Sequence, residues 1–355
     1  MRNAVPPTRG DDLVPGMRGE RPRRRGRRVF VTLLAVVLVL LLLVAGVIAY
    51  FVSSIGNDIN RIPDAFRGLD TSARPADSGG TTFLLVGTDS RSTEPTTGAD
   101  ADPEARAGSQ RSDVIMLGTL AADGSTASVV SIPRDSWVDI PGRGMNKINA
   151  AYAYGGEPLL IETVEQLTGV RVDHFGVIDF AGFTSLVDSV GGIDVNVARP
   201  TSNAGVDFVE GENHLDGEQA LAYVRQRYDL PGGDIDRVAR QQNAIKALLQ
   251  TVQQKATTDP AAVYAFATSV GDAVSVDDSL SNTGLIQLAF EARGLRSSDV
   301  AYVTAPVAGL GREGAQSVVY LDQARGQELW NAVRDGSVAR FAEQNPQLAL
   351  SATPS

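Results

Sequence analysis

The sequence predicts an α/β fold: a layered α/β/α domain with a central, mainly buried sheet, preceded by one N-terminal transmembrane helix. Two patterns lead to this prediction. An uncharged apolar stretch of 23 residues occupies positions 29–51, and from residue 81 onward short apolar runs bounded by turn residues alternate with amphipathic helical segments. Hydrophobic residues make up 43 % of the 355 residues, which is enough to bury a sizeable core.

The apolar stretch VFVTLLAVVLVLLLLVAGVIAYF (29–51) is long enough to cross about 30 Å of hydrocarbon as a helix. A cleaved signal peptide is the alternative, but its apolar region is normally shorter and ends in a small-residue cleavage site. Residues 1–28 hold nine arginines and three acidic residues, a net charge of +6. The positive-inside rule therefore places this tail in the cytoplasm. We predict a single-pass protein of the cell membrane whose body is extracytoplasmic.

The remaining boundaries follow from composition. Residues 1–28 are predicted to form a disordered Arg-rich tail and the polar segment 52–80 a stalk. Residues 81–345 are predicted to form one domain without internal repeats, and 346–355 a disordered tail. The low-complexity segment 92–108 indicates a flexible loop within that domain.

Composition excludes several kinds of site. The chain has no cysteine, so disulfides, thiolate zinc sites and a cysteine nucleophile are excluded. Its two histidines, His174 and His214, lie forty positions apart, which makes a histidine metal cluster improbable. The net charge of the chain is −10, so the part after the +6 tail carries −16. An acidic body argues against nucleic-acid binding, and any anion site must be local.

The expected elements follow in chain order. Apolar runs predict buried strands at 83–87, 114–120, 127–132, 174–180, 193–197, 301–306 and 317–322. Helical patterns are expected at 157–167, 183–190, 217–224, 236–255 and 323–335.

Polar residues stand at the ends of the first three strands. They are Asp89 and Arg91 in GTDSR, Arg111 and Asp113 in RSD, and Arg134 and Asp135 in PRD; Lys147 and Asn149 follow in a turn. Each group alone is ordinary, because an Asp after a strand is commonly a turn former and the turn residues commonly cap a helix. Three groups on neighbouring strands indicate a ligand site, since ligands bind at strand ends in α/β domains. Two carboxylates without histidine favour Mg²⁺ or Mn²⁺ shared with phosphate oxygens.

The stretch LAYVRQRYDLPGGDIDRVARQQ (221–242) holds four arginines: Arg225, Arg227, Arg237 and Arg240. The first two alternate as on an extended segment, and the last two share one face of a predicted helix with Gln241. The Pro-Gly-Gly turn folds these two arms together, so facing guanidinium groups form a pocket for a doubly charged anion such as pyrophosphate. The alternative is a solvated charged face paired with Asp229, Asp234 and Asp236.

Six segments, in order, resemble the LytR-CpsA-Psr family: GTDSR, RSDVIML, SIPRDSWVDIPG, KINAAYAYGG, FAGFTSLVDSVGGIDV and LDGEQALAYVRQRYDLPGGDIDRVARQQ. The resemblance covers residues 82–335, and its motifs are long and ordered. A single N-terminal membrane helix agrees with the usual layout of that family. The sequence departs from it by a longer loop between Asp89 and Arg111.

The resemblance implies a phosphotransferase outside the membrane, with 81–345 as its catalytic domain. Such enzymes move a glycopolymer from a polyprenyl-pyrophosphate carrier to peptidoglycan, usually onto the 6-hydroxyl of N-acetylmuramic acid, through a phosphodiester. By the same resemblance, Asp89 and Asp113 bind Mg²⁺, and the lipid lies in an apolar cleft within the layers. The residues implied to surround the phosphates are Arg134, Lys147, Arg225, Arg227, Arg237, Arg240 and Gln241. Asp113, Arg134 and Arg227 are the implied catalytic residues, and the general base is either Asp113 or Asp135.

Three other functions use parts of this pattern. A transcriptional regulator is opposed by the predicted topology, which leaves only a short Arg-rich tail in the cytoplasm. A non-catalytic glycopolymer- or lipid-binding module gains nothing from Asp89 and Asp113 beside a bound phosphate. Simple pyrophosphatase action on the carrier uses the same residues and differs only in the acceptor.

Overall fold

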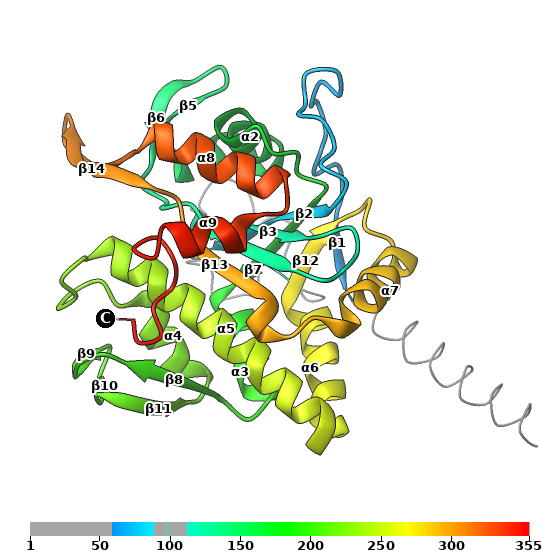
Figure 1. The fold of residues 1–355 in the computed structure, drawn as a ribbon, viewed down its shortest axis with the longest axis vertical. Coiled ribbons are helices and arrows are strands. Elements are labelled where there is room, and N and C mark those ends of the chain that lie inside the picture. Colours follow the sequence, from blue (N-terminus) through cyan, green and yellow to red (C-terminus); the bar gives the residue numbers. More distant parts are fainter. Residues whose placement is uncertain (1–58, 89–96, 98–111, 355) are drawn as a thin grey trace, which may run out of the picture. The chain divides into compact units, whose positions relative to one another are not determined.

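The computed structural model describes residues 59–88, 97 and 112–354. In this described part a seven-stranded mixed sheet forms the centre, in the order β1-β12-β7-β2-β3-β4-β13 (Figure 1). These strands are β1 (Asn60–Ile62), β12 (Val274–Asp277), β7 (His174–Asp179), β2 (Thr81–Thr88), β3 (Ser112–Leu120), β4 (Ala127–Ser131) and β13 (Val300–Thr304). β2 is parallel to β7 and antiparallel to β3, and β3 is antiparallel to β4. The predicted α/β fold with a central sheet is confirmed.

Shorter strands form hairpins around this sheet. They are β5 (Trp137–Ile140) with β6 (Gly144–Lys147), β8 (Ile193–Val197) with β11 (Gly211–Leu215), β9 (Thr201–Asn203) with β10 (Val206–Phe208), and β14 (Val307–Glu313) with β15 (Gln316–Leu321). The helices are α2 (Asn149–Thr168), α3 (Phe180–Ser189), α4 (Gly217–Arg225), α5 (Asp234–Thr258), α6 (Pro260–Ala273), α7 (Asn282–Glu291), α8 (Gln323–Arg334) and α9 (Val338–Gln344). Figure 1 shows α8 and α9 on one side of the sheet and α3, α5 and α6 on the other.

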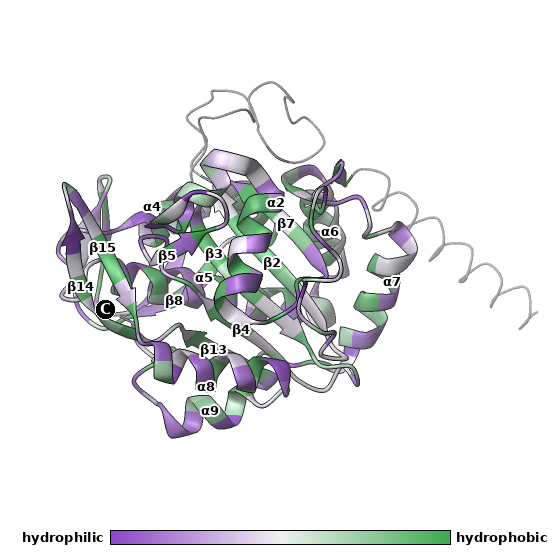
Figure 2. Cartoon of the chain, turned by 90° about the horizontal axis from the view of Figure 1, so that it is seen from above, coloured by the Kyte–Doolittle hydropathy of each residue, from purple (hydrophilic) through white to green (hydrophobic). Residues whose placement is uncertain are grey.

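The two faces of the sheet are packed differently. Alternate residues of a strand point to opposite faces. Leu84 and Val86 of β2 and Leu117 of β3 belong to the main core, together with residues of α2, α8 and α9. The intervening Leu85 and Met116 face α3, α4 and α5, where a cavity remains. Figure 2 shows that the central strands are apolar, as expected for a sheet that is covered on both faces.

The predicted strands and helices are present with shifted ends. The largest shift is in α2, which begins at Asn149 rather than at residue 157. Gly155 and Gly156 interrupt it with non-helical backbone angles, and Pro158 follows in the first turn after the break. The first half of this helix was not predicted, because glycine and proline normally end a helical pattern.

Two predicted boundaries need correction. The described part of the predicted stalk (59–80 of 52–80) packs on the domain: Ile62 and Ala65 are buried in the main core, and Arg74 forms an ion pair of 2.7 Å with Glu165. The predicted disordered tail (346–355) is ordered through residue 354. Its backbone bonds to the domain, with Leu350 N donating to Tyr302 O at 3.0 Å. Pairing through the backbone leaves no side-chain pattern for sequence analysis to detect.

The predicted transmembrane segment, residues 29–51, lies outside the described residues. Among the residues described, none of the helices has the length and apolar character needed to span a membrane.

Candidate active site

The first part of the site lies where β3 begins and β4 ends. Because these strands are antiparallel, their ends meet at one edge of the sheet, and Ile132 N donates to Ile115 O at 2.9 Å. Arg134 Nη1 contacts Asp113 Oδ1 across this edge. Lys147, at the end of β6, lies 3.2 Å from Asp135 Oδ1. The structure thus brings together the predicted PRD, RSD and lysine groups.

The second part is the turn between α4 and α5. Gly233 adopts a φ of 57°, which favours glycine, and Asp236 accepts a hydrogen bond of 2.8 Å from Gly232 N. The turn carries Asp234 between the two predicted arms. Arg237 Nη2 lies 2.8 Å from Asp234 Oδ1, and Arg227 Nε lies 3.6 Å from the same oxygen. Sequence analysis named Asp234 only as a partner in a solvated face, whereas here its side chain is largely buried and joins both arms.

Electrostatics join the two parts into one group, which we call the cation cluster: Asp113, Arg134, Arg227, Asp234 and Arg237. The pKa of Arg237 falls to about 10, chiefly because the side chain is 4 % exposed; Asp234 opposes this fall, while Arg134 and Arg227 add to it. The pKa of Arg134 is raised, because attraction to Asp113, Asp234 and Asp135 outweighs burial. Three guanidinium groups therefore face two carboxylates; Arg134 and Arg237 are buried, whereas Arg227 is half exposed.

Several buried polar atoms of this region lack a hydrogen-bond partner among the described residues. They are Nε of Arg134 and of Arg237, Oγ1 of Thr88 and Oγ of Ser112. Leaving a buried donor unpaired costs about 1–3 kcal/mol, and more for a charged group. The unpaired guanidinium nitrogens therefore fit an anionic ligand that accepts from both arginines.

A cavity of about 270 Å³ lies on the α3–α5 face of the sheet, next to this cluster. Its walls are formed by aliphatic and aromatic side chains such as Leu85, Met116, Phe183 and Leu248. Gly176 contributes no side chain there, and a Cβ atom at this position would lie 3.3 Å from Leu85. The apolar cleft implied by the family resemblance is thus present in the structure.

Two predicted phosphate ligands lie at the border of this apolar cavity. Gln241 lines it, and its Nε2 lies 3.5 Å from Val224 O. Arg225 is the last residue of α4, and its guanidinium carbon stands 4.5 Å from the ring centre of Phe180, which also lines the cavity. Arg225 is therefore helical, and the predicted extended alternation with Arg227 is wrong.

Arg240 does not belong to the cation cluster, contrary to the prediction. It is fully buried, and its Nη1 and Nη2 donate to Gln226 Oε1 at 2.6 Å and to Thr201 Oγ1 at 3.0 Å. Its guanidinium carbon also lies 4.5 Å from the ring centre of Tyr223. Positions 240 and 241 diverge by about 100° around a helix, so they flank Arg237 on opposite sides. Arg237, Arg240 and Gln241 were predicted to share one face of the helix, but Arg240 and Gln241 point in different directions.

The donors available for a metal are oxygen atoms. Asp89, Arg91 and Arg111 lie outside the described residues, so the pairing of Asp89 with Asp113 stays a prediction. Among the described residues, no three His, Asp or Glu side chains gather into a metal cluster. At this edge of the sheet, Asp113 and Asp135 supply carboxylate oxygens. This oxygen set fits Mg²⁺, which is commonly held by one or two carboxylates together with substrate phosphates.

Comparisons with known proteins show which family the chain belongs to. The LytR_cpsA_psr family model matches residues 55–335. The cell wall biosynthesis protein LcpA of Corynebacterium glutamicum is 33 % identical, over 92 % of this chain and 71 % of its own. The polyisoprenyl-teichoic acid–peptidoglycan teichoic acid transferase TagU of Enterococcus faecalis is 35 % identical, over 64 % of this chain and 72 % of its own.

Solved structures show the same architecture. TagT bound to LI-WTA aligns with a TM-score of 0.57 and 25 % identity, covering 79 % of this chain and 96 % of its own. TagV of B. subtilis aligns with a TM-score of 0.58 and 27 % identity, covering 74 % of this chain and 99 % of its own. The family match spans most of the chain and includes every described part of the site, so this protein belongs to the LytR-CpsA-Psr family.

Proposed function

We propose that this protein is a phosphotransferase that moves a cell-wall glycopolymer from a polyprenyl-pyrophosphate carrier to peptidoglycan, forming a phosphodiester. The observation that carries the proposal is the junction of the cation cluster with the apolar cavity. Such a junction fits a ligand with a doubly charged head and a hydrocarbon tail. The names of TagU and LcpA, as a teichoic acid transferase and a cell wall biosynthesis protein, support the same class of substrate.

The two ends of the donor would be held by different forces. Its prenyl chain gains about 25 cal/mol for each Å² of apolar surface buried in the cavity. Its pyrophosphate accepts hydrogen bonds from Arg134, Arg227 and Arg237, whose buried Nε atoms at Arg134 and Arg237 lack partners among the described residues. The pKa of Arg237 is lowered chiefly by burial and further by repulsion from Arg134 and Arg227, and an anion bound there offsets this repulsion. Donor binding therefore removes electrostatic costs already present in the protein.

In the proposed reaction, an oxygen of a peptidoglycan hydroxyl bonds to the phosphorus on the sugar side of the pyrophosphate. The bond from that phosphorus to the bridging oxygen breaks, and polyprenyl monophosphate leaves with the electron pair. The hydroxyl proton passes to Asp113 or Asp135, the two carboxylates at this edge. Charge on the phosphoryl oxygens is stabilised by the arginines, since phosphoryl transfer depends mainly on positioning and electrostatics.

A divalent cation is part of the proposal. Asp113, with Asp89 after β2, would hold Mg²⁺ or Mn²⁺, which when bound neutralises charge on the pyrophosphate oxygens. The partners follow from the reaction: a lipid-linked glycopolymer, peptidoglycan and the membrane that holds the carrier. The body would act on the outer side of the cell membrane, tethered by residues 29–51, so that carrier and enzyme share one surface.

The proposal is tested with the purified full-length protein, a radiolabelled prenyl-pyrophosphate-linked glycan and isolated peptidoglycan. Wild type should attach the label to peptidoglycan, and Arg134→Gln should slow attachment at least 100-fold, because a charge-assisted hydrogen bond in a desolvated site is lost. Arg340→Gln is the matched control, since Arg340 is exposed on α9. Attachment at the wild-type rate by Arg134→Gln would exclude the cation cluster from the reaction.

A further inference from the structure

A second cavity, larger than the apolar one, lies beside the β5–β6 hairpin. It measures about 640 Å³ and is enclosed by β5, β6, β15, α8 and the C-terminal end of α2. The chain has two tryptophans, and both line this cavity: Trp137 on β5 and Trp330 on α8. Tyr320 of β15 adds a third aromatic ring. We call this cavity the aromatic groove.

The polar side chains of the aromatic groove are amides and carboxylates. They are Asp139, Gln166, Asp322, Gln323 and Gln327, and the described residues that line the groove include no Lys, Arg or His. Planar amides and carboxylates hydrogen-bond hydroxyl and acetamido groups, while aromatic faces pack against the apolar faces of sugar rings. A polyanion is disfavoured, because two carboxylates line the groove without a cation. The lining therefore fits an uncharged saccharide.

The groove begins beside the sheet edge where β3 begins and β4 ends, which we call the reaction edge. In the β5–β6 hairpin Trp137 pairs in register with Lys147, and Lys147 contacts Asp135. Trp137 follows Asp135 by two residues, roughly 7 Å along the chain at about 3.3 Å per residue. Val319 of β15 donates its backbone N–H to Asp135 O at 2.9 Å, which ties the β14–β15 hairpin to the same point. A saccharide stacked on Trp137 would therefore lie close to Asp135, which follows Arg134 of the cation cluster in the chain.

The aromatic groove and the apolar cavity border different layers. The apolar cavity lies against α3, α4 and α5, whereas the groove lies against α2 and α8, on the face where Leu84 and Val86 are packed. The lining of the apolar cavity fits hydrocarbon, and the lining of the aromatic groove fits sugar.

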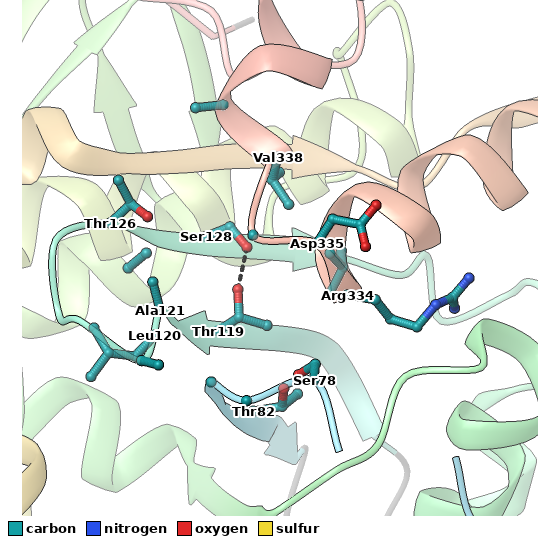
Figure 3. A pocket seen from close by; sticks show the side chains of 17 residues that line it. Ser78, Thr82, Thr119, Leu120, Ala121, Thr126, Ser128, Arg334, Asp335 and Val338 are labelled. Atoms are coloured by element: carbon teal, nitrogen blue, oxygen red, sulfur yellow. Dashed lines mark hydrogen bonds between the residues drawn. The ribbon is translucent and has the colours of Figure 1, made fainter. Parts of the chain in front are cut away.

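A third cavity provides a contrast. It measures about 340 Å³ and lies at the opposite edge of the sheet, where β2 begins and β3 ends (Figure 3). Its described lining has hydroxyl groups and no aromatic ring, and Thr119 Oγ1 and Ser128 Oγ satisfy each other at 2.5 Å. Neither a stacking surface nor the reaction edge is near, so we assign no ligand to it.

We propose that the aromatic groove binds the acceptor: a stretch of uncharged N-acetylated glycan strand, whose free hydroxyl it presents to the cation cluster. This inference rests on the proposed function. Trp137 and Tyr320 provide the stacking surfaces, and the hydrogen bond of 2.7 Å from Tyr320 OH to Glu313 holds the tyrosine ring in place. Gln323 and Gln327, on the first turns of α8, reach the sugar substituents from the side.

The test uses the intrinsic fluorescence of the full-length protein in detergent, because both tryptophans report on the groove. The probe is an uncharged tetrasaccharide of N-acetylglucosamine, which carries the acetamido and hydroxyl groups of the glycan strand without a carboxylate. We expect a saturable change in fluorescence, with Kd at least tenfold higher for Trp137→Ala and within about threefold of wild type for Trp137→Phe, since a ring is retained. Phe290→Ala removes a 63 % exposed ring on α7 and should leave Kd unchanged.

Thermal melting of each variant checks that it is folded. If Trp137→Ala has a much lower melting temperature than wild type, Trp137→Phe and Gln323→Leu are compared instead. Gln323→Leu is expected to bind the tetrasaccharide more weakly than wild type. Absence of a saturable change in wild type, or an unchanged Kd in folded Trp137→Ala, overturns the inference. A fluorescence change produced by a prenyl-pyrophosphate-linked disaccharide but not by the glycan strand would assign the groove to the donor and also overturn it.

Equilibrium dialysis with a short-chain prenyl pyrophosphate separates the two proposals. Prenyl pyrophosphate binding without saccharide binding would defeat the acceptor groove alone. Saccharide binding without prenyl pyrophosphate binding would defeat the proposed transferase while the groove assignment survives as a saccharide site.

Discussion

At the scale of single residues, this protein uses buried arginines in two ways within one turn of α5. Arg240 is enclosed by protein: two uncharged oxygens accept from it, and Tyr223 lies against its guanidinium. Arg237, three residues earlier, contacts Asp234 but leaves its buried Nε without a partner among the described residues. The first arrangement stabilises the packing between α4 and α5, and the second leaves binding capacity for a ligand.

Replacing Arg240 should therefore affect stability rather than substrate binding. Arg240→Met preserves length but leaves Gln226 Oε1 and Thr201 Oγ1 without their donor. Hydrogen bonds to a charged group contribute about 1.5–3 kcal/mol each, so we expect a loss of about 2 kcal/mol or more in the free energy of unfolding. Urea denaturation measures this loss, with exposed Arg340→Met as control. Unchanged stability together with lost pyrophosphate binding would return Arg240 to the cation cluster.

Arg227 should depend on the shape of its guanidinium group and not on charge alone. Arg227→Lys keeps the charge but loses the planar fork, so one of two charge-assisted hydrogen bonds to pyrophosphate disappears. At about 1.5–3 kcal/mol per bond and 1.36 kcal/mol per tenfold in rate, transfer should slow by roughly 10- to 100-fold. Single-turnover transfer measures the rate, with melting curves of both proteins. An equal rate would mean that Arg227 is only a solvated partner of Asp234.

At the scale of elements, the sequence was most informative where apolar runs are long. β2, β3, β4 and β7 sit in the middle of the sheet, so their apolar runs are continuous and predicted them correctly. The β5–β6 hairpin and β14 are half exposed, and α7 has no fully buried residue. Such elements are stabilised by tertiary contacts that leave only a weak pattern in the sequence.

The candidate site divides along the same line. Strand-end residues such as Asp113 and Arg134 were predicted, because strand order fixes where they meet. The role of Asp234 was missed, since bridging two arms is a property of the folded turn. The aromatic groove was also missed: Trp137 and Trp330 lie 193 positions apart (330 − 137) and are brought together because β5 and α8 both pack against α2.

The strand ends predict a metal requirement. Asp113 supplies a carboxylate at the edge where the pyrophosphate would lie, and hard oxygen donors select Mg²⁺ or Mn²⁺. Transfer should therefore cease in excess EDTA and return when Mg²⁺ is restored, and Asp113→Ala should abolish transfer while the protein remains folded by circular dichroism. Full turnover of wild type in EDTA would refute the metal assignment.

At the scale of the whole molecule, charge is divided between a tail of +6 and a remainder of −16. The division predicts sidedness, because arginines before a membrane helix stay in the cytoplasm. Protease added to intact protoplasts should degrade the body from about residue 52 onward and leave a protected N-terminal fragment. A body that resists protease until the membrane is lysed would place it inside, away from peptidoglycan, and would contradict the proposed transfer.

The central claim is that the protein moves a phosphoryl group with its glycan, and the fate of the donor phosphates tests it most directly. A prenyl-pyrophosphate-linked glycan is prepared with ³²P in the phosphate next to the sugar and incubated with the protein, Mg²⁺ and isolated peptidoglycan. The account predicts that ³²P appears in peptidoglycan, in a phosphodiester resistant to phosphatase, while unlabelled prenyl monophosphate is released in equal amount. Label that stays in soluble sugar phosphate or free phosphate, with none in peptidoglycan, would contradict it and identify a pyrophosphatase instead.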